Sequence, residues 1–219
     1  MAFDKANKDK HLDKAVREMI AQAGKDGVLP ITQMGEPVLR RVTDEYVGQL
    51  DERTLKNLIK AMRTTMLEAP GVGLAGPQVG LSLAIAVVED HKRKDDEDDP
   101  RDIQNFPFHA IINPKYEPVG DATASYYEGC LSFEGYQAVR KRWLEIDATW
   151  QDEQAQWHTE RLHGWPARIF QHETDHLSGE VYIDKAEIRS LANDDNLSYY
   201  WCDDPVPTHA AEVLGFELD

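Results

Sequence analysis

The segment PARIFQHETDHL, residues 166–177, restricts the fold more than any other part of the sequence. Its residues suit a helix, because proline fits the first turn and Gly179 lies just beyond the expected end. The face that such a helix turns toward a core carries Ile169, His172, Glu173, His176 and Leu177. The rest of the chain therefore has to fold around a helix that buries two imidazoles and a carboxylate.

The two histidines of this helix are suited to bind one metal ion. Because His172 and His176 are four residues apart, they lie about 40° apart around the helix axis and can face the same ion. Burial of these polar groups is costly without a partner, and a divalent cation would supply one. Glu173 is next to the first histidine, where a general base could act on a nearby water. The alternative is an exposed polar face that matches the motif by chance.

A catalytic metal site of this type needs a third protein ligand and one open position. In zinc metalloproteases that ligand is a downstream glutamate or a third histidine. The continuation LSGEVYID shows neither signature clearly, because Glu180 lies only four residues after His176. A thiolate is the other candidate, and Cys130 lies in the small-residue turn EGCLS, residues 128–132.

The stretch GVGLAGPQVG, residues 71–80, contains the pattern G-x-G-x-x-G, which is also found in dinucleotide-binding turns. Such a turn follows a strand and opens a helix whose N-terminus holds a pyrophosphate. Here the amphipathic segment 51–68 predicts a helix before the glycines, ended by Ala69-Pro70. The short apolar segment 81–89 predicts a buried strand after them. The order helix, loop, strand therefore disfavours a dinucleotide site.

The remaining sequence is rich in strand-like segments. Helical spacing predicts one more helix at residues 12–23, and the charge run 90–103 predicts a solvated loop. Strands separated by turns are expected within residues 109–120, 125–129, 136–150 and 154–164. The Asn/Asp-rich stretch 191–198 is expected to interrupt the order of the C-terminal tail. This arrangement indicates the α+β class.

The overall charge limits the possible partners. The 219 residues include 24 basic and 40 acidic side chains, for a net charge of −16. Direct binding of nucleic acid or of an anionic membrane is not expected, because it uses clustered Lys and Arg. The N-terminus is polar and no apolar run is long enough to span a membrane, so we expect a cytoplasmic protein.

Three blocks occur in order along the chain: GVGLAGPQ (71–78), EGCLS (128–132) and QHETDHLSG (171–179). Together they resemble the three signature motifs of the peptide deformylases, metal hydrolases that remove formate from the N-terminal formyl-methionine of new bacterial and organellar proteins. The resemblance covers roughly residues 29–185. It implies antiparallel β-sheets packed around a central metal-binding helix. Residues 1–28 would form an N-terminal helical extension, and residues 186–219 an acidic C-terminal extension.

The resemblance also implies a role for individual residues. It makes Cys130, His172 and His176 the metal ligands, with water in the fourth position. Glu173 becomes the general acid/base. Two groups would stabilise the oxyanion that forms during amide hydrolysis: the side-chain amide of Gln78 and the backbone N–H of Leu131. The residues implied in contacts with an extended substrate are Val72, Gly73 and Gly129.

The family's usual metal is ferrous iron, and zinc, nickel or cobalt can take its place. A thiolate with two imidazoles suits all of these ions. The implied partners are the N-formyl-methionyl peptides of nascent chains, with transient contact to the ribosome. The acidic C-terminus lacks the basic helix that some members use there, and Gln137 stands where many members have a substrate-facing arginine.

Two other functions remain open at this level. A zincin-type metallo-endopeptidase would use the same helix with a downstream carboxylate ligand and no role for Cys130. A non-catalytic module that binds peptide N-termini could retain the metal without turnover. Cys202, in YYWCDD, is expected to be a structural residue, in the simplest interpretation a small buried apolar side chain. The histidines without ligand spacing are expected to be structural or to lie on the surface: His11, His91, His109, His158, His163 and His209.

Overall fold

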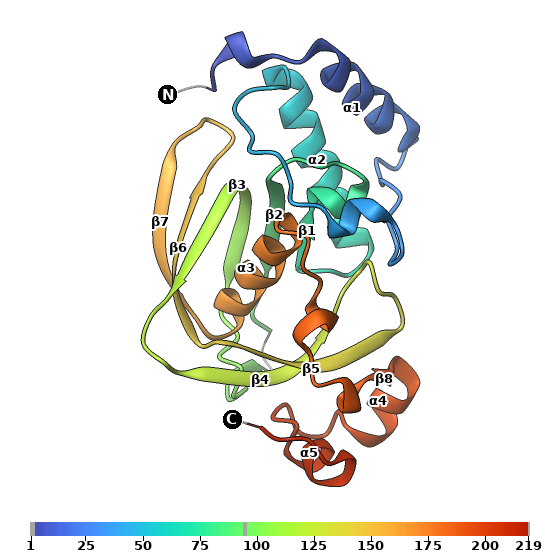
Figure 1. Cartoon of the computed structure of the whole chain (residues 1–219), viewed down its shortest axis with the longest axis vertical. Helices are drawn as coiled ribbons and strands as arrows, with labels where there is room; N and C mark the ends of the chain where they lie inside the picture. Colours follow the sequence, from blue (N-terminus) through green and yellow to red (C-terminus); the bar gives the residue numbers. More distant parts are fainter. Residues whose placement is uncertain (1–2, 94–95, 219) are drawn as a thin grey trace.

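The computed structural model describes residues 3–93 and 96–218, so the charge run 90–103 lies partly outside the described residues. Strands surround helix α3, Gly164–Leu177, which runs through the centre of the molecule (Figure 1). The larger sheet has five strands in the order β1-β2-β3-β6-β7, and the smaller has three in the order β4-β5-β8. All the pairs within these sheets are antiparallel. The expected α+β class is confirmed.

The strands alternate with few helices along the chain. The larger sheet comprises β1 Gly73–Ala75, β2 Ile85–Asp90, β3 Phe106–Pro118, β6 Glu145–Gln151 and β7 Trp157–His163. The smaller sheet comprises β4 Thr123–Gly129, β5 Tyr136–Trp143 and β8 Ala192–Asn193. The other α-helices are α1 Lys10–Gln22, α2 Glu52–Glu68, α4 Asp194–Tyr200 and α5 Thr208–Leu214. Away from residues 94–95, 3-10 turns form at Lys5–Asn7, Pro37–Arg40, Gly76–Val79, Tyr182–Lys185 and Ile188–Ser190.

Strand β2 explains how the larger sheet is held between two helices. Successive side chains of a strand point to opposite faces of the sheet. Ile85 and Val87 pack into the core cluster that contains the buried face of α2. Ala86 and Val88 pack into the cluster beneath α3. The strand is therefore apolar at every one of these positions, which is typical of a strand that is buried on both faces.

The expected stripe of α2 is confirmed. Its buried residues include Leu55, Leu58, Ile59, Met62 and Met66. The helix ends at Glu68, two residues before Pro70, and Ala69 caps it with φ −90° and ψ 23°, outside the helical region that a following proline disfavours. Helix α1 packs along α2 through Val16, and the main-chain N–H of Asp51 donates to the buried Asp13 carboxylate at 2.9 Å. The N-terminal segment is thus joined to the domain by both apolar and polar contacts.

The glycine-rich stretch differs from the expected plain loop. Residues 73–75 form strand β1, which pairs antiparallel with β2, and residues 76–79 form a 3-10 turn that contains Pro77. An antiparallel pair cannot be the parallel unit of a dinucleotide-binding turn. The rejection of a dinucleotide site is therefore confirmed.

Other expectations are corrected by the structure. Helix α3 begins at Gly164 and not at Pro166. The long strand expected at 136–150 is broken at Leu144 into β5 and β6, because its N–H donates to Ala122 O and its O accepts from Gly164 N.

The C-terminal tail also differs from expectation. The stretch 191–198 is ordered, since it forms β8 and the start of α4, where Asn193 caps the helix by accepting from Asn196 N. Cys202 is exposed and not a buried apolar residue. Within residues 3–93 and 96–218, no helix has the length and apolar character needed to cross a membrane.

Candidate active site

The three sequence blocks come together around one cleft. The first block supplies β1 and the following 3-10 turn, the second ends β4, and the third lies on α3. The cleft has a volume of about 1070 Å³. It is lined by eight of the nine residues predicted to act in the site: Val72, Gly73, Gln78, Gly129, Cys130, Leu131, His172 and Glu173. His176, the ninth, is completely buried behind His172.

Cys130, His172 and His176 form a compact group of metal-binding atoms. One ligand atom from each residue lies within 4.8 Å of the other two, and Cys130 Sγ is 3.3 Å from His176 Nε2. Among the residues that the structure describes, this is the group of His, Cys and acidic side chains with ligand geometry. Glu180 is not part of it, because its carboxylate binds Arg140 Nη2 at 2.7 Å and Lys185 Nζ at 2.6 Å.

The electrostatic environment of this group favours a cation. Burial lowers the pKa of His172, but hydrogen bonds to Cys130 and Glu128 outweigh burial and raise it to about 10. Burial, followed by the charge of His172, holds the pKa of His176 well below its usual range. The groups around His172 therefore favour a positive charge at this place. A thiolate and two imidazoles are also the donor set that a transition metal requires, so the residues fit a metal ion.

Glu173 lies beside the metal-binding group and is 4% exposed. Within the described part of the chain, its Oε2 atom has no hydrogen-bond partner. Its Oε1 atom fills the space above Gly73, where a Cβ atom would lie only 2.2 Å away. Burial raises the pKa of the carboxyl group to about 7. A carboxyl group with this pKa can both accept and donate a proton near neutral pH.

Gln78 is held in a single orientation. Its Oε1 atom accepts a hydrogen bond from Ala75 N at 2.8 Å, which turns Nε2 toward the cleft, 3.5 Å from Cys130 Sγ. The side chain is only 1% exposed, and it is part of the 3-10 turn that follows β1. The amide therefore presents a fixed N–H donor beside the metal-binding group.

The predicted substrate-binding residues lie on the edges of both sheets. Val72 and Gly73 precede and begin β1, an outer strand of the larger sheet, and Gly129 ends β4, an outer strand of the smaller sheet. The cleft runs between these two edges. An outer strand has main-chain groups that can pair with an extended peptide.

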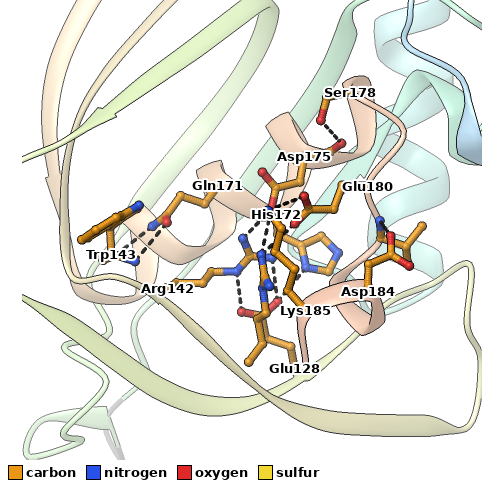
Figure 2. Close-up of polar contacts among 12 residues, drawn as sticks. Glu128, Arg142, Trp143, Gln171, His172, Asp175, Ser178, Glu180, Asp184 and Lys185 are labelled. Carbon is orange, nitrogen blue, oxygen red and sulfur yellow. Dashed lines mark hydrogen bonds and ion pairs between the residues drawn. The ribbon is translucent and has the colours of Figure 1, made fainter. Parts of the chain in front are cut away.

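The sequence analysis missed the charged cluster behind His172. Figure 2 shows Arg142 between Glu128 and Asp175, with His172 beside them. Glu128 Oε2 lies 3.0 Å from His172 Nδ1, so it orients the ring with Nε2 toward the site. Arg142 donates to Glu128 at 2.6 and 3.0 Å and to Asp175 at 2.7 Å. Arg168 also donates to Glu128.

These charges are almost fully removed from water. Burial alone would raise the pKa of Glu128, but Arg142 and Arg168 outweigh it and hold the pKa well below its usual range. The carboxylate therefore stays ionised and accepts a hydrogen bond from His172 Nδ1. A sequence signal for this cluster exists: Ala138, Arg140 and Arg142 alternate on one face of β5, and that face is buried.

Comparisons with known proteins agree with this geometry. The family model described as polypeptide deformylase matches residues 28–191. Peptide deformylase 1 of Bifidobacterium longum is 67% identical over 97% of this chain and 98% of its own length. The peptide deformylase of Bifidobacterium adolescentis is 65% identical over 96% of both chains.

A solved structure extends the match to three dimensions. The Met-Ala-Ser-bound class I type b peptide deformylase of Acinetobacter baumannii is 30% identical and has a TM-score of 0.65. The match covers 72% of this chain and 98% of that one. A family match over most of the chain and relatives of this identity lead to one conclusion: the chain belongs to the polypeptide deformylase family of enzymes.

Proposed function

We propose that this enzyme removes the formyl group from the N-terminal formyl-methionine of newly made proteins and releases formate. The main support is that a Cys-His-His group, a buried carboxyl group and a fixed amide donor face one cleft. Cys130, His172 and His176 hold one divalent metal ion. We assign Fe²⁺ as the native ion, and Zn²⁺, Ni²⁺ or Co²⁺ as ions that the same donors accept.

The bound ion supplies Lewis-acid catalysis, because it polarises a carbonyl group and makes water more acidic. Glu173 moves the proton. Its carboxylate accepts a proton from the attacking water and then delivers it to the amine that leaves as the new N-terminus. Its pKa of about 7 suits both steps, because neither protonation state is strongly preferred at neutral pH.

Two donors stabilise the negative charge that develops on the formyl oxygen. Gln78 supplies Nε2, whose direction is fixed by the bond from Ala75 N to Oε1. The backbone N–H of Leu131, the residue after Cys130, supplies the second donor. Donors that are oriented before the reaction lose no free energy in reorganising during it.

The peptide lies extended between the two sheet edges. Val72 and Gly73 contact it from one side and Gly129 from the other, so main chain and not side chains forms most of the contact. The relative from Acinetobacter baumannii binds Met-Ala-Ser, which supports a peptide in the equivalent cleft. Recognition through main chain lets one enzyme process many nascent chains.

The wider assignment follows from this role. We propose that the enzyme acts in the cytoplasm, in transient contact with the ribosome and without binding nucleic acid directly. Residues 29–185 form the catalytic domain, residues 1–28 an N-terminal helical extension and residues 186–219 an acidic C-terminal extension. The net charge of −16 is consistent with a partner surface that is local rather than broad.

The test is formate release from a formyl-methionyl peptide by protein that has been purified and loaded with metal without oxygen. Wild type should release formate, whereas Glu173→Ala should retain metal and lose turnover. Cys130→Ala should lose both. Absence of formate from the metal-loaded wild type, or undiminished release by Glu173→Ala, would reject the mechanism. Cleavage of internal peptide bonds by an active Cys130→Ala variant would instead favour the endopeptidase.

A further inference from the structure

The C-terminal extension reaches the substrate cleft. Asp194, the first residue of α4, lines the cleft together with Glu134 and Gln137. Strand β8 brings it there by pairing with β5, where Asn193 lies opposite Tyr136 and Ala192 lies opposite Gln137. In Figure 1 the extension lies below β5, at the end of the molecule away from α1 and α2.

Asp194 is held in place by its main chain and by its side chain. Its N–H donates to Gly135 O at 3.1 Å, and its Oδ1 atom accepts from Gln137 Nε2 at 3.3 Å. The Gln137 side chain in turn lies over Gly129, since a Cβ atom at Gly129 would be 3.3 Å from Gln137 Cγ. The carboxylate is thus fixed beside the strand end that we assign to substrate contact.

The charge on this side of the cleft is negative. Asp194 and Glu134 are both exposed, and within the described part of the chain neither takes part in a salt bridge. Two arginines also line the cleft, but each is already paired. Arg101 donates to Asp99 at 2.9 and 2.7 Å, and Arg168 donates to Glu128. The uncompensated charge beside Gly129 is therefore acidic.

We propose that Asp194, presented by the C-terminal extension and fixed by Gln137, selects for formyl-peptides with a basic side chain after the formyl-methionine and against those with an acidic one. The carboxylate of Glu134 adds to the negative charge on this side of the cleft. This inference rests on the proposed placement of the peptide along Gly129. The effect is one of selectivity, because Asp194 lies beside the path of the downstream residues and takes no part in the chemistry.

The expected preference for basic peptides is modest because Asp194 faces solvent. Ion pairs between exposed charges contribute little binding free energy, which corresponds to about a two- to fivefold difference in kcat/KM between a lysine and a glutamate peptide. Salt screens such interactions, so the difference should shrink as ionic strength rises.

The experiment compares kcat/KM for amidated formyl-methionyl tripeptides that carry Lys, Gln or Glu at the second or the third position. Wild type should prefer Lys over Glu at one or both positions. Asp194→Asn should remove most of that preference while it leaves the rate on the Gln peptides nearly unchanged. Gln137→Arg should also reduce it, because a guanidinium at this place would pair with Asp194.

Asp195→Asn is the matched control. Asp195 is the next residue of the same helix and carries the same charge, but it is not among the residues that line the cleft. It should keep the wild-type preference, which separates a local effect from the net charge of the protein. An unchanged Lys-to-Glu ratio in Asp194→Asn, or an equal loss in Asp195→Asn, would overturn the proposal. Formate release from the Gln peptides tests the proposed function separately.

Discussion

Glu173 occupies a space that exists only because residue 73 is a glycine. A Cβ atom at Gly73 would lie 2.2 Å from Glu173 Oε1, 2.5 Å from Cδ and 2.6 Å from Cγ. All three distances are far below van der Waals contact. The Glu173 carboxyl group can therefore pack against strand β1 only because residue 73 has no side chain. The glycine of the first sequence block thus allows close approach to the side chain proposed as general acid/base, as well as to the proposed substrate.

The first prediction follows from this contact. Gly73→Ala should displace the Glu173 carboxyl group, because the side chain is the more flexible partner. A displacement of about 1 Å at a catalytic group can reduce kcat by roughly 10²-fold. Formate release measured beside metal content and the thermal midpoint should show low kcat with metal and folding retained. A variant with normal kcat would mean that the carboxyl position is not critical.

At the level of elements, Arg142 joins three parts of the fold. It lies on β5, donates to Glu128 on β4 and donates to Asp175 on α3. Its side chain is only 2% exposed, and its partners are nearly as well buried. The ion pairs therefore fix the position of helix α3 against the smaller sheet.

Arg142→Met should be strongly destabilising. Loss of the guanidinium removes three hydrogen bonds from two buried carboxylates, although Glu128 keeps Arg168 and Asp175 keeps the hydroxyl of Tyr116. Loss of one partner of a buried ion pair costs about 3–5 kcal/mol in comparable cases. Denaturant unfolding measures the change. The control is Arg161→Met, which removes a two-bond ion pair with Asp147 on an exposed part of β6 and β7 and should change stability little. Similar losses in both variants would contradict a special role of the buried cluster.

A second pair connects α2 to the larger sheet. Arg63 on α2 donates twice to Glu89 on β2, at 2.6 Å in both cases. These hydrogen bonds lower the pKa of Glu89. A carboxyl group whose pKa is lowered by folding stabilises the protein above its unfolded pKa of about 4.3, and this contribution is lost as pH falls through the folded pKa.

Glu89→Gln should therefore lower the free energy of unfolding at pH 7 by about 1 kcal/mol, a modest amount because Arg63 is partly exposed. The difference from wild type should narrow as pH is reduced below about 5. Urea unfolding at a series of pH values measures this difference in the free energy of unfolding. Glu68→Gln, at the exposed end of α2, serves as the control and should show no such dependence on pH. A difference that stays constant with pH would contradict the assignment.

At the level of the whole molecule, the sequence predicted the parts that depend on local spacing. The buried stripes of α3 and α2 follow from such spacing, whereas the gathering of three blocks in one cleft was implied by the resemblance to the peptide deformylases. The break at Leu144 and the pairing of β8 with β5 depend on partners far away in the chain. The buried ion pair between Glu128 and Arg142 was missed for the same reason, because a charged residue by itself predicts an exposed position.

The metal should stabilise the whole domain without being required for folding. The three proposed ligands are carried by a helix and a strand end that the core already holds. Metal at about 100 times its dissociation constant would add about 2.7 kcal/mol. Chelation should therefore lower the thermal midpoint but leave a cooperative transition, as measured by calorimetry. Cys130→Ala should lose the metal-dependent shift. Complete unfolding on chelation would contradict this view.

The C-terminal segment also has a consequence for how separate molecules of this protein meet. Strand β4 covers one edge of β5, and the tail covers the other through β8, through Ser190 Oγ and Glu187 N at Val139, and through the bridge from Ala186 to Arg140. A bare strand edge is a template for pairing with another chain. Proteolytic removal of the tail would expose such an edge, so the trimmed protein should aggregate more readily during concentration than the full chain.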